Sequence, residues 1–123
     1  MKKLAEPLWL DEPSDKDCAA AETCLQLLYG DKKSHKWRKA LKGAQVKHYA
    51  AKDLLRASGT PISEVQAFDF SKQQTEIADG MFLSPILLLR QDEGNCLIIA
   101  DGFHRMGAVF CRDQEALIPC KIA

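Results

Sequence analysis

The first third of the chain carries apolar residues at the spacing of an amphipathic helix. Between Cys18 and Leu28 they recur three and four positions apart, which places them on one helical face. Ser14 has a hydroxyl that can accept a hydrogen bond from the first backbone N–H groups, and Gly30 is typical of a residue that ends a helix. The pattern predicts a helix between these two positions.

Shorter patterns follow as far as residue 80. Trp37 and Leu41 lie four positions apart and share a helical face, and isolated glycines mark the ends of several segments. The predicted elements are a short helix around 36–41 that ends near Gly43, a short strand at 46–49, a helix at 50–57 with Leu54 and Leu55 inward and Gly59 as its stop, and a helix at 72–79 that is capped by Ser71 and ended by Gly80.

Two strongly apolar strands come next. Ile86–Leu89 and Cys96–Ala100 do not alternate apolar with polar residues, so both faces of both strands should be covered. Between them, Asp92–Asn95 predicts a turn in which Gly94 and Asn95 tolerate positive φ. The N-terminal helices are expected to form one of the covering layers.

A helix at 103–113 and a strand at 117–122 complete the predicted fold. Gly107 costs this helix about 1 kcal/mol relative to alanine, which is explained if its backbone approaches a strand closely. Pro119 suits an edge or irregular position in a sheet. The residues predicted to pack on the sheet are Phe103, Met106, Gly107 and Phe110.

The composition is that of a globular chain. Its 123 residues fit one domain, and 46% hydrophobic with 28% charged residues excludes a disordered polymer, a collagen-like repeat and a coiled coil. The longest apolar run, Cys96–Ala100, is far shorter than the roughly 20 residues of a membrane helix, and acids interrupt any N-terminal signal sequence. The sequence therefore predicts a cytoplasmic protein without membrane association, whose cysteines are reduced thiols.

The net charge is zero but unevenly distributed. Residues 1–31 carry minus four, residues 32–52 plus eight, and residues 53–123 minus four. Segment 32–52 holds eight Lys or Arg residues and no acid, so it can attract an anion or a nucleic acid. The alternative is a solvated segment that balances its acidic neighbours, because a nucleic-acid-binding domain usually has a net basic charge.

Candidate chemistry gathers where the second apolar strand ends, at Asp101-Gly102-Phe103-His104-Arg105. Gly102 permits a sharp turn into the last helix. The first N–H groups of a helix lack partners within it, and the helix dipole favours negative charge there. With the side-chain donors of His104 and Arg105, the run Gly102, Phe103, His104 and Arg105 predicts a phosphate-binding turn.

The magnitudes single out one residue of this turn. The dipole contributes about 0.3–1 kcal/mol, whereas millimolar binding requires about 4 kcal/mol. Charge-assisted hydrogen bonds of about 1.5–3 kcal/mol each must supply the rest. Arg105 is therefore expected to be the principal phosphate ligand. The alternative is that Arg105 pairs with Asp101 or Asp113 in a surface ion pair, which contributes about 0–1 kcal/mol.

The two strands and the turn together resemble the core of the ParB/sulfiredoxin-like superfamily. The resemblance rests on Pro85–Leu89, a short turn and Leu97–Arg105. It implies an α+β fold, with a small mixed sheet covered by helices, as a ParB/sulfiredoxin-like domain at 46–123. Residues 1–45 would be an N-terminal helical extension that packs on this core. In this superfamily the turn binds nucleotide phosphates.

The motif is most similar to the D-G-H-H-R string of the free-serine kinases in that superfamily, from which it differs only at Phe103. The resemblance implies that Asp101 and His104 are catalytic and that the ligand is ATP, ADP or CTP with Mg²⁺. Asp53 and Glu64 are candidates for a second acidic residue by rough position. Phe103 stands where sulfiredoxins carry their catalytic cysteine, so sulfinic-acid reduction is not implied.

Two functions follow from these features. One is an enzyme, a nucleotide-dependent phosphotransferase or nucleotide hydrolase, which needs a second carboxylate within about 4–6 Å of Asp101 or of a bound metal. The other is a non-catalytic ParB-like module that senses a nucleotide or contacts nucleic acid through segment 32–52, which needs its eight basic residues on one continuous exposed face. The sequence leaves the choice between them and the oligomeric state open.

Overall fold

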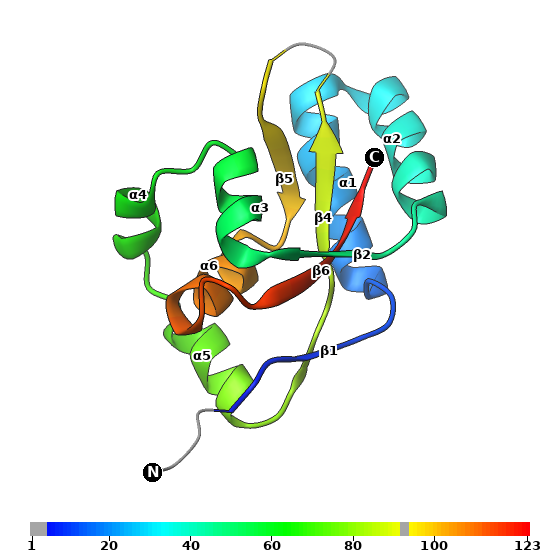
Figure 1. Cartoon of the computed structure of the whole chain (residues 1–123). Coiled ribbons are helices and arrows are strands. Elements are labelled where there is room, and N and C mark those ends of the chain that lie inside the picture. Colours follow the sequence, from blue (N-terminus) through cyan, green and yellow to red (C-terminus); the bar gives the residue numbers. More distant parts are fainter. Residues whose placement is uncertain (1–4, 92–93) are drawn as a thin grey trace.

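A four-stranded mixed sheet lies at the centre of the computed structural model, which describes residues 5–91 and 94–123. The strand order is β2-β6-β4-β5. β6 pairs antiparallel with β2 and parallel with β4, and β4 pairs antiparallel with β5. Helices cover both faces (Figure 1), so the predicted α+β class is confirmed. The strands are β2 (Lys47–Ala50), β4 (Ile86–Arg90), β5 (Leu97–Asp101) and β6 (Leu117–Ile122).

Helices α1 (Asp15–Tyr29) and α2 (Asp31–Gly43) cover one face of the sheet. The predicted start and end of α1 are confirmed, because Ser14 Oγ accepts the Asp17 N–H at 3.2 Å and Gly30 closes the helix. The predicted start of the second helix at residue 36 is wrong. Gly30 ends α1 and begins α2 at once, with φ at 81°, so no linker separates the two helices.

The other face carries α3 (Ala51–Ala57), α4 (Ile62–Gln66), α5 (Ser71–Ala78) and α6 (Phe103–Arg112), which Figure 1 shows grouped on one side of the sheet. Leucines of α3, Val65 of α4 and most of α6 are buried with β4 and β6 in one cluster. α4 lies where only a connection was expected, because the two apolar side chains in its five residues, Ile62 and Val65, show little periodicity. The remaining predicted helices and strands agree within one to two residues at their ends.

The predicted cap of α5 and the edge alternative for Pro119 are wrong. Ser71 does not cap α5: it is the first residue of the helix, and Asp69 Oδ1 accepts its N–H at 2.9 Å. Pro119 does not lie on an edge strand, because β6 runs between β2 and β4. An inner proline is tolerated since the pairing of β6 with β4 begins only at Cys120, opposite Ile86, so Pro119 precedes the ladder that would require its N–H.

A second, two-stranded parallel sheet joins β1 (Leu8–Trp9) to β3 (Phe82–Leu83). The sequence pattern does not predict this sheet, because two-residue strands have no measurable alternation. Just beyond it, the N–H of Ser14 donates to Ser84 Oγ at 3.0 Å. The N-terminal segment is therefore attached beside the start of β4.

Close packing explains Gly107. A methyl group at this position would overlap the ring of Phe70, so the helix backbone meets an aromatic ring of the α5 start rather than a strand. In the predicted turn, Asp92 and Glu93 lie outside the described residues, and Gly94 has φ of 103°. None of the helices within 5–91 and 94–123 has the length and apolar character that crossing a membrane requires.

Candidate functional site

The turn between β5 and α6 has the backbone geometry that the sequence predicts. Gly102 is in the left-handed conformation, with φ of 110° and ψ of 16°, and is the N-cap of α6. Its carbonyl accepts the Met106 N–H at 3.0 Å. No described side chain caps the helix, so Phe103, His104 and Arg105 present the backbone N–H groups that a helix start leaves without internal partners.

The Arg105 guanidinium is held by two acids. Its Nη2 donates to Asp101 Oδ2 at 2.8 Å, and its Nη1 lies 3.5 Å from Asp17 Oδ1. The exposed fractions of the three side chains are 16%, 16% and 18%. Arg105 Nε is buried and has no hydrogen-bond partner among the described residues. The guanidinium therefore links α6, β5 and α1 within the fold.

Sequence reasoning missed Asp17. It occupies the third position of α1, where Ser14 Oγ donates to its Oδ2 at 2.9 Å. A serine followed three residues later by an acid is an ordinary helix-start signature, so the local pattern explained Asp17 without pointing to a distant arginine. The second acid beside Asp101 comes from α1, outside the segment that resembles the superfamily.

The two carboxyls respond to this environment in opposite directions. Burial raises the pKa of Asp101, and the proximity of Asp17 adds to this effect, while Arg105 opposes it. Burial also acts to raise the pKa of Asp17, but hydrogen bonds with Ser84 and Ser14 and the charge of Arg105 outweigh it and lower that pKa. As the pH falls, Asp101 takes up its proton before Asp17 does.

Aromatic rings surround the other side of the turn. The ring of Phe103 lies 4.9 Å from Phe68 and 6.2 Å from Phe70, centroid to centroid. The imidazole of His104 makes edge contacts with all three phenylalanines, and its side chain is exposed. His104 is thus positioned by packing while its ring remains accessible to solvent.

Asp53 and Glu64 are not brought to the turn. Among the described residues, the charged groups that influence Asp101 are Arg105 and Asp17. Asp53 is exposed on α3, where it pairs with Arg56 at 3.1 Å, and Glu64 is exposed on α4. The structure gives neither residue a role beside Asp101.

The donor set at the turn does not fit a metal held by the protein alone. No described group of three His, Cys, Asp or Glu side chains could hold a metal ion. The two carboxylates at the site, Asp17 and Asp101, already contact Arg105. Mg²⁺ is usually bound by one or two carboxylates together with substrate phosphates. Here both carboxylates are already paired with the Arg105 guanidinium.

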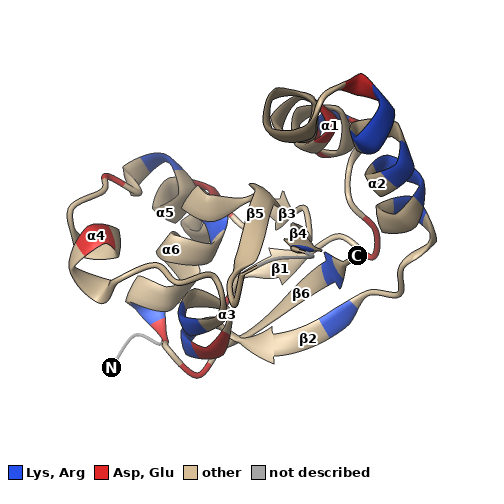
Figure 2. Ribbon diagram, turned by 90° about the horizontal axis from the view of Figure 1, so that it is seen from above, with Lys and Arg blue, Asp and Glu red and all other residues tan. Residues whose placement is uncertain are grey.

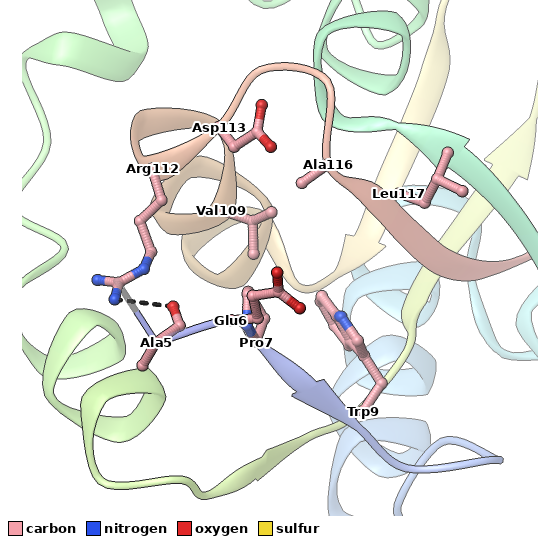
Figure 3. A pocket seen from close by; sticks show the side chains of 9 residues that line it. All are labelled: Ala5, Glu6, Pro7, Trp9, Val109, Arg112, Asp113, Ala116 and Leu117. Carbon is pink, nitrogen blue, oxygen red and sulfur yellow. Dashed lines mark hydrogen bonds between the residues drawn. The ribbon is translucent and has the colours of Figure 1, made fainter. Parts of the chain in front are cut away.

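A cavity of about 620 Å³ lies at the opposite end of α6, away from this turn. Figure 3 shows Trp9, Val109 and Leu117 around it, and the guanidinium of Arg112 donating to the carbonyl of Ala5 at 3.1 Å. Arg112 also donates to Gln74 at 2.6 Å. The contacts of Arg112 hold the N-terminal segment against the fold.

Comparisons of the chain with protein-family models, with curated protein sequences and with solved structures find no match. The resemblance to the ParB/sulfiredoxin-like superfamily rests on the residues of strands β4 and β5 and of the turn alone.

Proposed function

We propose that the turn between β5 and α6 binds a phosphorylated small molecule, with a nucleotide as the expected ligand. The observation that carries this proposal is the uncapped start of α6 after a left-handed Gly102. A helix start with free N–H groups attracts oxyanions through hydrogen bonds and through its dipole. The resemblance to a superfamily that binds nucleotide phosphates at this turn supports the same ligand class.

Backbone amides and His104 are the donors ready for a phosphate. His104 is exposed in the first turn of α6, so its ring is accessible to a ligand. Arg105 differs, because its Nη1 and Nη2 are engaged by Asp17 and Asp101. Its direct use as a phosphate ligand requires that one of these contacts be exchanged for the ligand.

Charge at the site sets a pH dependence for binding. Two ionised carboxylates and one guanidinium leave one negative charge, which repels a phosphate. Protonation of Asp101 removes that charge, and burial has already raised its pKa. Phosphate affinity should therefore increase as the pH falls through the pKa of Asp101.

The catalytic form of this proposal assigns phosphoryl transfer or nucleotide hydrolysis to the same turn. Asp101 would act as the base, since a raised pKa makes a carboxylate a stronger base. Its Oδ2 is bonded to Arg105, so the proton acceptor would be the other oxygen. No step is assigned to a metal, because the carboxylates at the turn are engaged.

Calorimetric titration with ATP, ADP and CTP, with and without Mg²⁺, tests the proposal. His104→Glu places a negative charge at the start of α6 and should weaken binding at least about tenfold, which corresponds to 1.4 kcal/mol. His48→Glu, an equal change at an exposed residue of β2, should have no such effect. Amide shifts of Phe103, His104 and Arg105 in NMR spectra should report the bound phosphate.

Two results decide against the proposal or limit it. Absence of binding by every nucleotide and by inorganic phosphate at millimolar concentration refutes the phosphate site. Binding without turnover on a panel of hydroxyl acceptors, and without hydrolysis, limits the function to sensing.

A nucleic-acid-binding module is the second candidate, and the surface of α2 favours it. Figure 2 shows basic residues following one another along this helix. Lys32, Lys36 and Lys39 lie on the side opposite buried Ser34 and Leu41. The exposed basic residues of α2 are Lys32, Lys33, Lys36, Arg38, Lys39 and Lys42.

The eight basic residues of segment 32–52 do not all belong to this surface, so the condition that all eight form one continuous exposed face is not met. Lys47 lies on β2, and Lys52 of α3 pairs with Glu115 at 2.7 Å. If α2 binds duplex nucleic acid, affinity should fall steeply with salt, and Lys36→Glu with Lys39→Glu should reduce the slope. A salt-independent affinity rules out this candidate.

A further inference from the structure

A buried lysine lies on the sheet face that α1 and α2 cover. The side chain of Lys121, on β6 in register with Leu87, is only 7% exposed, and a lysine is almost never buried this deeply without partners. Its Nζ donates to the main-chain oxygen of Lys42 at 3.0 Å and lies 2.8 Å from Glu12 Oε2. The Lys42 carbonyl belongs to the last turn of α2, where the helix dipole is negative.

A cavity of about 370 Å³ lies next to this ammonium group. Leu41 and Leu87 contribute apolar walls, and Arg38 and Lys42 contribute two further cations. The volume falls within the range of about 300–1,000 Å³ of small-molecule sites, which combine apolar walls with a few converging polar groups. Its described lining includes no residue of 101–105, so it is separate from the β5–α6 turn.

The carboxylate that meets Lys121 is itself exposed. The side chain of Glu12, which precedes α1, is 67% exposed, against 7% for the lysine. A carboxylate from a ligand can replace Glu12 on Nζ while Glu12 turns into water and the bond to the Lys42 carbonyl remains. Because Glu12 is already well solvated, this exchange disturbs little of the fold.

The charged residues that line the cavity determine which net charge a ligand should carry. Besides its three cations, the lining includes Glu12, Asp15 and Glu22, and Glu22 pairs with Arg38 at 3.1 Å. When Glu12 leaves, three cations face two acids. One carboxylate neutralises this excess of one positive charge, whereas a dianionic phosphate exceeds it.

We propose that this cavity is a second ligand site, which binds a small organic monocarboxylate. The ligand's carboxylate contacts Lys121 in place of Glu12, and its hydrocarbon part packs on Leu41 and Leu87. In the free protein, Glu12 occupies the position of the ligand's carboxylate and competes with it.

NMR titration of the full chain with acetate, butyrate and hexanoate tests the proposal, with butyramide and inorganic phosphate as probes of the required charge. Butyrate and hexanoate should shift the amides of Leu41, Leu87 and Lys121 saturably and more strongly than acetate, and butyramide should not. Phosphate should shift Phe103 and His104 instead if the first site exists.

Matched variants separate this site from a general salt effect. Glu12→Gln removes the competing charge and should raise butyrate affinity about three- to tenfold, that is, by up to about 1.4 kcal/mol. Glu115→Gln, which removes the acid from the exposed pair with Lys52, should leave it unchanged. Lys121→Met should abolish binding.

Three outcomes overturn the proposal. They are no saturable shift with Glu12→Gln, equal affinity of the Glu12→Gln and Glu115→Gln variants, and butyramide binding as tightly as butyrate. If Lys121→Met does not fold, the comparison of the two glutamine variants decides alone.

Discussion

Arg105 and Lys121 are both cations held largely away from water, but their acidic partners differ. The side chain of Arg105 is 16% exposed, and its partners Asp101 and Asp17 are 16% and 18% exposed. Lys121 is 7% exposed, and its partner Glu12 is 67% exposed. A buried acid cannot return to water when its cation finds another ligand, whereas an exposed acid can. A buried cation is therefore available to bind a new anion only where its acidic partner is exposed to solvent.

The largest expected effect is on folding stability, when each cation is replaced by methionine. Arg105→Met leaves two partly buried carboxylates without their cation and should cost about 3–5 kcal/mol. Lys121→Met leaves Glu12 in solvent and removes only the donor to the Lys42 carbonyl, so it should cost about 1–2 kcal/mol. Urea unfolding of both variants measures the difference, and equal losses would contradict the distinction between the two cations.

A smaller loss of folding stability is expected from Gly102→Ala. The left-handed φ of 110° is unfavourable for alanine, and its Cβ would lie 2.5 Å from Ile86 Cδ1 and 2.9 Å from Arg105 Nη2. The variant should lose about 2–3 kcal/mol, since strain and overlap add. Gly80→Ala is the control, because Gly80 follows α5 with φ of 74° and open space around it, and should lose only about 1–2 kcal/mol. Chemical denaturation measures both losses. Equal losses of unfolding free energy would show that the side chains of Ile86 and Arg105 move aside without cost.

The two carboxylates around Arg105 should give opposite pH dependences. The pKa of Asp17 is lowered in the folded state, so its ionised form stabilises the fold above the ordinary value of 3.8, and this stability is lost as the pH falls through the folded pKa. The pKa of Asp101 is raised, so stability falls as the pH rises from 3.8 through its folded value.

Unfolding of Asp17→Asn and Asp101→Asn against pH tests this assignment. Relative to the parent, Asp101→Asn should gain stability as the pH rises above 3.8, because the asparagine does not ionise. Asp17→Asn should lose relative stability as the pH rises towards 3.8 from below. If stability depended on pH in the same way in both variants, the proton would be shared evenly between Asp17 and Asp101, and the assignment would be wrong.

The smallest expected effect is at Asp53 and Glu64. Asp53→Asn and Glu64→Gln should leave nucleotide affinity within about twofold of the parent, because both residues are exposed on other helices. Asp17→Asn should instead raise affinity, since it removes a negative charge next to Arg105. Calorimetric titration of the three variants with nucleotide checks these affinities. Weaker nucleotide binding by Glu64→Gln would show that Glu64 contributes to the site.

The sequence predicted the elements that have clear periodicity or clear end signals. Ser14 and Gly30 bound α1 as expected, and the continuous apolar runs of β4 and β5 are adjacent strands of the sheet. β1, β3 and α4 escaped prediction because each has too few residues to show a period. The inner position of β6 depends on pairing with β4, which Pro119 alone could not reveal.

The sequence predicts the backbone of the candidate site and offers the pair of Arg105 with Asp101 as an alternative, which the structure shows, but it does not predict the contact with Asp17. The string Asp101–Arg105 located the glycine turn and the helix start, because these are local features. The engagement of Arg105 depends on Asp17, a residue of a distant helix, and the sequence gives no register between α1 and α6. That a second acid holds Arg105 could be learned only from the tertiary structure.

The attachment of the N-terminal segment has a consequence for the order of folding. Its bonds to the rest of the molecule close very long loops: Ser14 to Ser84 spans 70 positions, and Arg112 to Ala5 spans 107. Contacts of such high contact order carry a large loop-closure entropy and slow folding. During synthesis, α1 and α2 are made well before the strands that they cover. The side chains of Leu25 and Leu41 therefore remain exposed to solvent until β4 and β5 have been synthesised. The apolar face of the two helices therefore stays uncovered until the later part of the chain has been made.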